Sequence, residues 1–227
     1  MSEVTAGILY LVATPIGNLG DISARALETL RQASAVVCED TRVTAKLLNH
    51  YAIKKPTLAW HHHSEPAVLE NIIKRLLAGD SLAYVSDAGT PGISDPGGKL
   101  AAAAAAAGIR LTPIPGPSAV TTALSVAGLA AERYLFMGFP PHKKGRQTFF
   151  KEVALSQYPV VFYESTHRIV KALQQLAELL PERQLVVARE LTKKFETIYR
   201  GQPAEIIEQL NQTSTKGEFV VIVAPSK

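Results

Sequence analysis

The first half of the chain alternates short runs of β-forming residues with stretches whose apolar residues recur at helical spacing. Ile22–Gln32 and Val68–Leu77 have that helical spacing. The runs expected to form strands are Ile8–Ala13, Ala35–Cys38, Thr57–Trp60, Leu82–Ser86 and Ile109–Thr112. Because a strand that is followed by a helix pairs in parallel with its neighbour, this order predicts a mostly parallel sheet with helices on both faces.

A proline-rich segment, Pro113–Pro117, divides the chain. Its three prolines and one glycine in five residues cannot continue a helix or a central strand, so we expect a hinge. The seven alanines Ala101–Ala107 before it predict a close-packed helix that ends at Gly108. The sequence therefore predicts two α/β domains, residues 1–116 and residues 117–227.

The second half holds another β-rich series. Its expected strands are Tyr134–Met137, Val160–Glu164, Leu185–Ala188, Thr197–Gly201 and Phe219–Val223. The last two lie closest to hairpin spacing, which indicates a mixed sheet.

Composition excludes several classes of protein. With 47% hydrophobic and 19% charged residues among 227, the chain can bury a core, and disorder is not expected. No apolar run approaches the ~20 residues that span a bilayer, and Met1–Gly7 does not resemble a secretory signal. One cysteine, Cys38, excludes a disulfide framework and fits a reducing cytoplasm.

Three loops at expected strand ends are rich in glycine, proline and small polar residues: Thr14–Asp21, Ser86–Gly97 and Pro115–Ala119. Ligands of open parallel sheets bind beyond the carboxyl ends of the strands, so these loops together predict a binding cleft, with ordinary tight turns as the alternative. Neither a nucleotide-phosphate loop nor a dinucleotide fingerprint is present. Glu39 and Asp40 lie where a ribose-binding acid would, which keeps a nicotinamide enzyme open.

Net charge is +4, and its densest cluster is Lys143, Lys144 and Arg146. These residues lie in Pro140–Gln147, a polar stretch that predicts an exposed loop able to contact RNA phosphates. A solvated turn is the alternative. His61–His63 are consecutive and make poor joint ligands, so no metal site is expected.

An ordered set of motifs resembles the tetrapyrrole-methylase superfamily over residues 8 to 224. The motifs are Val12–Ser23, Cys38–Arg42, Ser86–Gly97, Pro113–Ala119, Phe162–Ser165, Arg189–Lys193 and Lys216–Phe219. Within the superfamily they are most similar to the branch that methylates a ribose 2′-hydroxyl of a cytidine in 16S ribosomal RNA.

The resemblance implies two α/β domains of the class III methyltransferase type with S-adenosylmethionine in a cleft between them, a homodimer, and 16S rRNA, within the 30S subunit, as partner. The implied cofactor-binding residues are Pro15, Asp87, Gly89, Thr90, Ile93, Ser118, Ala119, Met137, Tyr163, Ala188 and Gly217. Two departures stand out: Thr166 replaces the usual proline, and the helical C-terminal region common in the family is expected to be absent after Lys227.

A ribose hydroxyl needs a base to take its proton, and four carboxylates lie at expected strand ends: Glu39, Asp40, Glu164 and Glu190. We expect catalytic roles for Asp40, Arg42 and Glu190, with Arg42 holding Asp40 or a phosphate. A structural salt bridge or helix cap is the alternative. A C-methylase of porphyrin or corrinoid precursors, a nicotinamide oxidoreductase and a catalytically silent RNA-binding module stay open as other functions.

Overall fold

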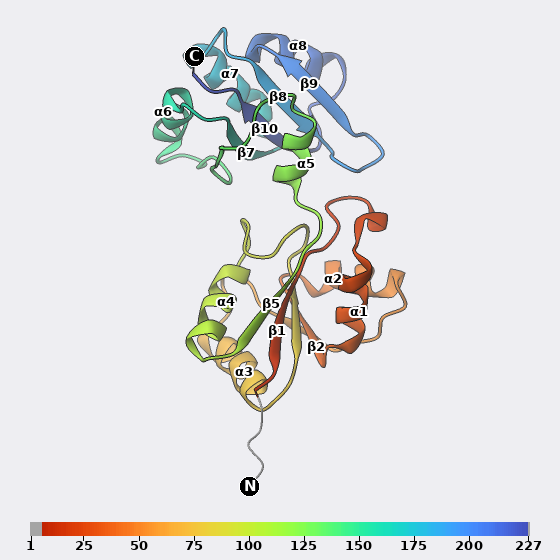
Figure 1. The fold of residues 1–227 in the computed structure, drawn as a ribbon. Helices are drawn as coiled ribbons and strands as arrows, with labels where there is room; N and C mark the ends of the chain where they lie inside the picture. Colours follow the sequence, from red (N-terminus) through yellow and green to blue (C-terminus); the bar gives the residue numbers. More distant parts are fainter. Residues whose placement is uncertain (1–5, 227) are drawn as a thin grey trace. The chain divides into compact units, whose positions relative to one another are not determined.

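The computed structural model describes residues 6–226 and divides into two compact units, Met1–Ser118 and Ala119–Lys227 (Figure 1). The sequence placed the division after residue 116, two residues earlier. Each unit has its own five-stranded sheet, so the chain is an α/β protein with two sheets.

The sheet of the first unit is parallel throughout, in the order β3-β2-β4-β1-β5. Its strands are β1 (Ile8–Val12), β2 (Ala35–Cys38), β3 (Thr57–Ala59), β4 (Leu82–Val85) and β5 (Arg110–Ile114). Its helices are η1 (Leu19–Asp21), α1 (Ala24–Gln32), α2 (Thr41–His50), α3 (Pro66–Leu77) and α4 (Gly97–Ala106). Every residue of β2 and β4 is buried, because helices cover both faces of the sheet.

Two separate apolar clusters fill these two faces. Leu30 of α1 and Leu48 of α2 pack with Val36 on one face. Ile72 of α3 and Leu100 of α4 pack on the other. Figure 1 shows the same division, with α1 and α2 on one side of the sheet and α3 and α4 on the other.

The expected end of the fifth strand was wrong. The strand continues through Pro113 to Ile114, and Pro113 pairs with Leu11 of β1. A proline lacks the N–H that a central strand would need, but β5 is an edge strand and needs only one bonded side. The chain leaves the sheet only at Pro115.

The sheet of the second unit is mixed, as predicted, in the order β6-β7-β10-β8-β9. Its strands are β6 (Leu135–Phe136), β7 (Val160–Ser165), β8 (Leu185–Arg189), β9 (Thr197–Gly201) and β10 (Glu218–Val223). Its helices are α5 (Ala119–Ser125), α6 (Arg146–Leu155), α7 (Ile169–Leu179) and α8 (Pro203–Gln212). Only β6 and β7 pair in parallel.

The antiparallel hairpin joins β8 to β9, so the expectation that the last two strands form it was wrong. Helix α8 separates β9 from β10, and β10 instead lies between β7 and β8. Within residues 6–226, no helix is long and apolar enough to cross a membrane.

Two neighbouring glycines at the start of α4 give a matched test of the packing. A Cβ on Gly97 would lie 2.3 Å from the Tyr84 ring, whereas a Cβ on Gly98 would meet nothing within 4 Å. We expect Gly97→Ala to lower the free energy of unfolding by about 1–3 kcal/mol through overpacking. Gly98→Ala should leave it unchanged or raise it by up to ~1 kcal/mol. Equal urea midpoints for the two variants would contradict this packing.

Candidate functional site

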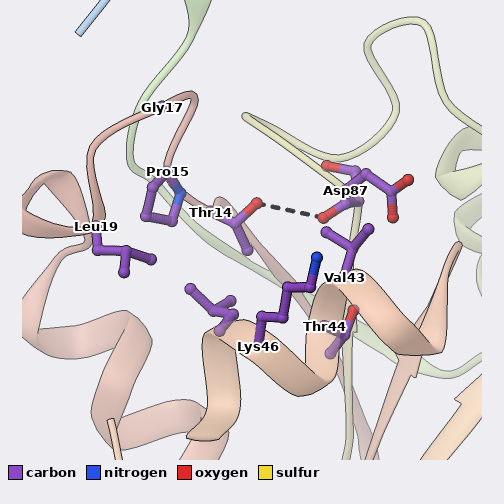
Figure 2. Close-up of a pocket in the computed structure, with 10 residues that line it drawn as sticks. Thr14, Pro15, Gly17, Leu19, Val43, Thr44, Lys46 and Asp87 are labelled. Atoms are coloured by element: carbon purple, nitrogen blue, oxygen red, sulfur yellow. Dashed lines mark hydrogen bonds between the residues drawn. The ribbon is translucent and has the colours of Figure 1, made fainter. Parts of the chain in front are cut away.

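A pocket of about 210 Å³ lies at the carboxyl ends of β1, β2 and β4, within the first unit (Figure 2). It is lined by Thr14, Pro15, Gly17, Leu19, Val43, Thr44, Lys46, Leu47, Ser86 and Asp87. These residues come from the loops that follow β1 and β4 and from helix α2, which follows β2. This is the edge of a parallel sheet at which ligands bind.

Backbone hydrogen bonds join the loops at this edge. The N–H groups of Thr14 and Gly89 each donate to the other residue's carbonyl oxygen, at 3.0 and 3.1 Å. The Thr14 hydroxyl donates to the carbonyl of Ser86 at 3.3 Å, and the Thr90 hydroxyl donates to that of Pro117 at 3.1 Å. The three loops singled out from the sequence therefore form one bonded network.

Asp95 fixes the shape of the loop after β4. Its carboxylate accepts the backbone N–H groups of Gly92, Ile93 and Gly97 at 2.6, 3.1 and 2.7 Å. The hydroxyl of Tyr84 also donates to it, at 3.0 Å. Burial, followed by the neighbouring Asp95 charge, raises the pKa of Tyr84, so its phenol stays a neutral donor.

Asp40 is the N-cap of α2 and forms a two-point ion pair with Arg42. One carboxylate oxygen accepts from the backbone N–H of Arg42 at 2.8 Å, and its guanidinium donates at 2.7 and 3.1 Å. These hydrogen bonds lower the pKa of Asp40 to about 2. A carboxylate with so low a pKa is a weak proton acceptor, which favours the structural alternative for Asp40. The Arg42 side chain is 87% exposed and can meet an anion.

Two other carboxylates at this edge have pKa values that are raised. Desolvation by the surrounding loops raises the pKa of Asp87 and of Glu39, and their mutual repulsion adds to the shift of Glu39. The backbone N–H of Asp40 donates to Asp87 at 3.1 Å and connects the ends of β2 and β4. Burial also raises the pKa of the Cys38 thiol, as expected for an inert thiol in the core.

Glu190 lies in the second unit, in a strained turn after β8. Its φ is +50°, and its carboxylate accepts from Lys193 Nζ at 3.0 Å and from the backbone N–H of Glu218 at 2.9 Å. Burial alone would raise its pKa, but these two donors outweigh burial and lower it. A Cβ on Gly217 would lie 2.8 Å from Glu190 Cγ, and Gly217 has φ +136°, so this position needs glycine.

The assignment of Arg146 to an exposed RNA-binding loop was wrong. Arg146 begins α6 and is 5% exposed. Its guanidinium donates to Gln175 at 2.7 Å and to the carbonyl of Pro141 at 3.3 Å, and it lies 3.6 Å from the Glu164 carboxylate. A single-sequence pattern of basic residues could not show that α7 covers this side chain.

Glu164 is likewise buried rather than open to a ligand, with its side chain 0% exposed. It pairs with Arg168 at 2.8 Å, and Arg168 donates to the carbonyl of Pro140 at 2.9 Å. Arg146, Glu164 and Arg168 form a cluster, here called the buried ion cluster, that anchors the loop before α6. Lys143 and Lys144 of this loop are exposed.

The remaining predicted residues of the second unit are partly or fully covered. Met137 packs against the core, and Ala188 is fully buried in β8. Tyr163 lies against the rings of Phe136 and Phe139, at 4.9 and 5.2 Å between centroids. Burial raises the pKa of Tyr163 to about 12.

The sequence did not indicate that α2 forms one wall of the pocket. Val43, Lys46 and Leu47 lie three and four residues apart and so share one helix face. Leu19 of η1 faces them, and Leu19 and Val43 are each 38% exposed. The helical spacing after the Asp40 cap was the signal that could have found this wall. In the part of the chain that the structure describes, no group of three metal-ligating side chains occurs.

Comparison with known proteins shows where this chain belongs. Residues 8–207 match the model of the tetrapyrrole (corrin/porphyrin) methylases. Ribosomal RNA small subunit methyltransferase I of Xylella fastidiosa is 51% identical over 96% of this chain and 82% of its own length. That of Haemophilus influenzae is 46% identical over 98% of this chain and 80% of its own length.

Solved structures agree on the fold. Diphthine synthase superposes with a TM-score of 0.73 at 16% identity, over 96% of this chain and 90% of its own. Uroporphyrin-III C-methyltransferase from Thermus thermophilus, in complex with S-adenosylhomocysteine, gives a TM-score of 0.65 at 16% identity, over 96% and 97%. The shared fold and the family match together define the class of protein as a two-sheet α/β methylase. The chain belongs to the tetrapyrrole (corrin/porphyrin) methylase family, which confirms the resemblance and removes the nicotinamide alternative.

The buried ion cluster gives a stability test. Glu164→Ala would leave two arginines without their shared carboxylate, so we expect the free energy of unfolding to fall by about 3–5 kcal/mol in urea titrations at neutral pH. Glu178→Ala, on the exposed face of α7, is the control and should change it by less than ~0.5 kcal/mol. Similar losses for both variants would argue against the cluster.

Proposed function

We propose that this protein uses S-adenosylmethionine to methylate the ribose 2′-hydroxyl of a cytidine in small-subunit ribosomal RNA. The observation that carries the proposal is the 51% identity, over 96% of this chain and 82% of the relative, with a ribosomal RNA small subunit methyltransferase. The pocket at the carboxyl edge of the first sheet supports it as a place for a small polar ligand. We further propose a cytoplasmic homodimer that acts on the 30S subunit.

The loops at this edge suit the proposed cofactor. Gly89 has φ +79° and Gly92 has φ +87°, a backbone conformation that residues with a Cβ rarely adopt. Because glycine has no side chain, the backbone after β4 can approach a ligand closely. Asp87 directly precedes this turn in the chain, so the start of the same loop borders the proposed cofactor. The proposed binding set keeps Pro15, Asp87, Gly89, Thr90, Ile93 and Ser118 from the first unit. From the second unit it keeps Ala119, Met137, Tyr163, Ala188 and Gly217.

S-adenosylmethionine, when bound, supplies an electrophilic methyl group on a cationic sulfur. It would supply that group to the ribose oxygen, with the C–S bond breaking as the C–O bond forms and the hydroxyl proton leaving to a base. The protein's contribution is mainly alignment, because such a displacement needs the reacting atoms in line. The lowered pKa values of Asp40 and Glu190 suit them to hold their loops in place, and the exposed Arg42 is proposed to contact RNA phosphate.

The decisive test is transfer of label from methyl-labelled S-adenosylmethionine to assembled small subunits and to naked RNA, followed by nuclease mapping. We expect label on the ribose of a cytidine. Label on a base would refute the 2′-O assignment. Label on a porphyrin precursor instead of RNA would favour the C-methylase alternative.

Lys143 and Lys144 are proposed to contact RNA phosphates from the anchored loop. Because each released counterion contributes to the salt dependence, Lys143→Ala or Lys144→Ala should each weaken RNA binding and flatten the plot of log K against log salt by about 0.7–0.9. Calorimetric affinity for S-adenosylmethionine should hold. Lys171→Ala, an exposed lysine of α7, is the control. An unchanged salt slope in both loop variants would remove the loop from the RNA site.

A further inference from the structure

The pocket is small for the whole cofactor. Sites that enclose a drug-sized ligand commonly have volumes of about 300–1,000 Å³, whereas this pocket has about 210 Å³. Its size instead suits one planar ring system. A single unstacked base is a ligand of that size, and sequence-specific RNA recognition depends on bases splayed out of the strand.

The walls of the pocket are apolar where a ring face would lie. Pro15 and Leu19 contribute one side, and Val43 of α2 contributes another (Figure 2). Leu47 of the same helix also lines the pocket. Leu19 and Val43 leave 38% of their surfaces in water, which is a cost that a bound base would remove.

Lys46 supplies a cation to this pocket. Figure 2 shows its side chain extending from α2 toward the loops of Thr14 and Asp87. Across residues 6–226, no hydrogen bond or ion pair engages its ammonium group. An unpaired donor at the wall of an apolar pocket can bind the carbonyl oxygen of a base.

Asp87 supplies the complementary acceptor from another wall. The backbone N–H of Asp40 uses one of its oxygens, at 3.1 Å, and leaves the carboxylate with further acceptor capacity. A carboxylate accepts the exocyclic amine of cytosine, whereas uracil has a carbonyl oxygen at that position and would be repelled. Lys46 and Asp87 together therefore match cytosine and disfavour uracil.

The pocket also shares residues with the proposed cofactor loops. Pro15 and Asp87 belong to both, and Asp87 directly precedes the segment that continues to Gly89 and Thr90. In-line methyl transfer requires that the target nucleotide and the methyl donor lie next to one another. A base pocket that borders the cofactor loops satisfies this requirement.

We propose that the Lys46 pocket receives the base of the target cytidine, with Asp87 accepting its exocyclic amine and Lys46 donating to its carbonyl oxygen. This inference rests on the proposed function and assigns the recognition of its substrate. It makes Lys46 and Asp87 the residues that determine specificity for cytidine over uridine.

The first experiment measures methyl transfer to small subunits and cofactor affinity by calorimetry for Lys46→Ala, Lys46→Arg and the control Lys74→Ala, an exposed lysine of α3. We expect Lys46→Ala to raise KM for the subunit about tenfold, the effect of losing one base contact, with cofactor affinity unchanged. Lys46→Arg should recover part of the loss, and Lys74→Ala should behave as wild type.

The second experiment compares subunits that carry cytidine or uridine at the mapped position. Wild type should favour cytidine by tenfold or more, and Asp87→Asn should narrow this ratio, because an amide can also donate to the uracil oxygen. Cofactor affinity is measured for this variant as well, so that the ratio is compared at saturating cofactor.

Several results would overturn the proposal. If Lys46→Ala left KM for the subunit unchanged, or lowered affinity for the cofactor and not for RNA, the pocket would not be the site of the target base. If Asp87→Asn kept the wild-type preference for cytidine over uridine, Asp87 would not be a residue that recognises the base. If wild type transferred no methyl group at all, the proposed function would fail, and the dependence of subunit binding on Lys46 would still decide whether the pocket holds RNA.

Discussion

The reciprocal backbone hydrogen bonds between Thr14 and Gly89 hold the candidate site together. The carboxyl ends of β1 and β4 are neighbours in a parallel sheet, and this bridge connects the loops that follow them. The bridge fixes Pro15 relative to Asp87, and the Thr90 hydroxyl extends the same network to Pro117. Backbone pairing and side-chain hydrogen bonds therefore join the pocket, the proposed cofactor loops and the end of the first unit.

Charged groups in this protein divide into those that shape the backbone and those left for ligands. Asp40 caps α2 and Asp95 gathers three N–H groups, so both carboxylates satisfy donors that the loops would otherwise leave unpaired. Lys46 and the exposed guanidinium of Arg42 do not hold a backbone loop in this way. The division explains why Asp40, one of the carboxylates that the sequence suggests as a base, has a lowered pKa and is a poor one.

The buried ion cluster shows the same logic in the second unit. Arg146 and Arg168 donate to the carbonyls of Pro141 and Pro140, and Glu164 holds the two arginines. The cluster therefore fixes the start of the loop that presents Lys143 and Lys144. Arg146 is buried and holds that loop through the carbonyl of Pro141, so its charged group is not available to a binding partner.

The sequence by itself determined the α/β class, the expected strands and the loops that follow them, because these depend on local periodicity and turn chemistry. It also carried the family resemblance, since motifs such as Ser86–Gly97 are contiguous. Only the tertiary structure decided that Pro113 lies in an edge strand, that Arg146 is covered by α7, and that Lys46 and Asp87 line one pocket. Each of these depends on which segments, distant along the chain, become neighbours when the sheets and helices pack, and residue spacing does not encode that.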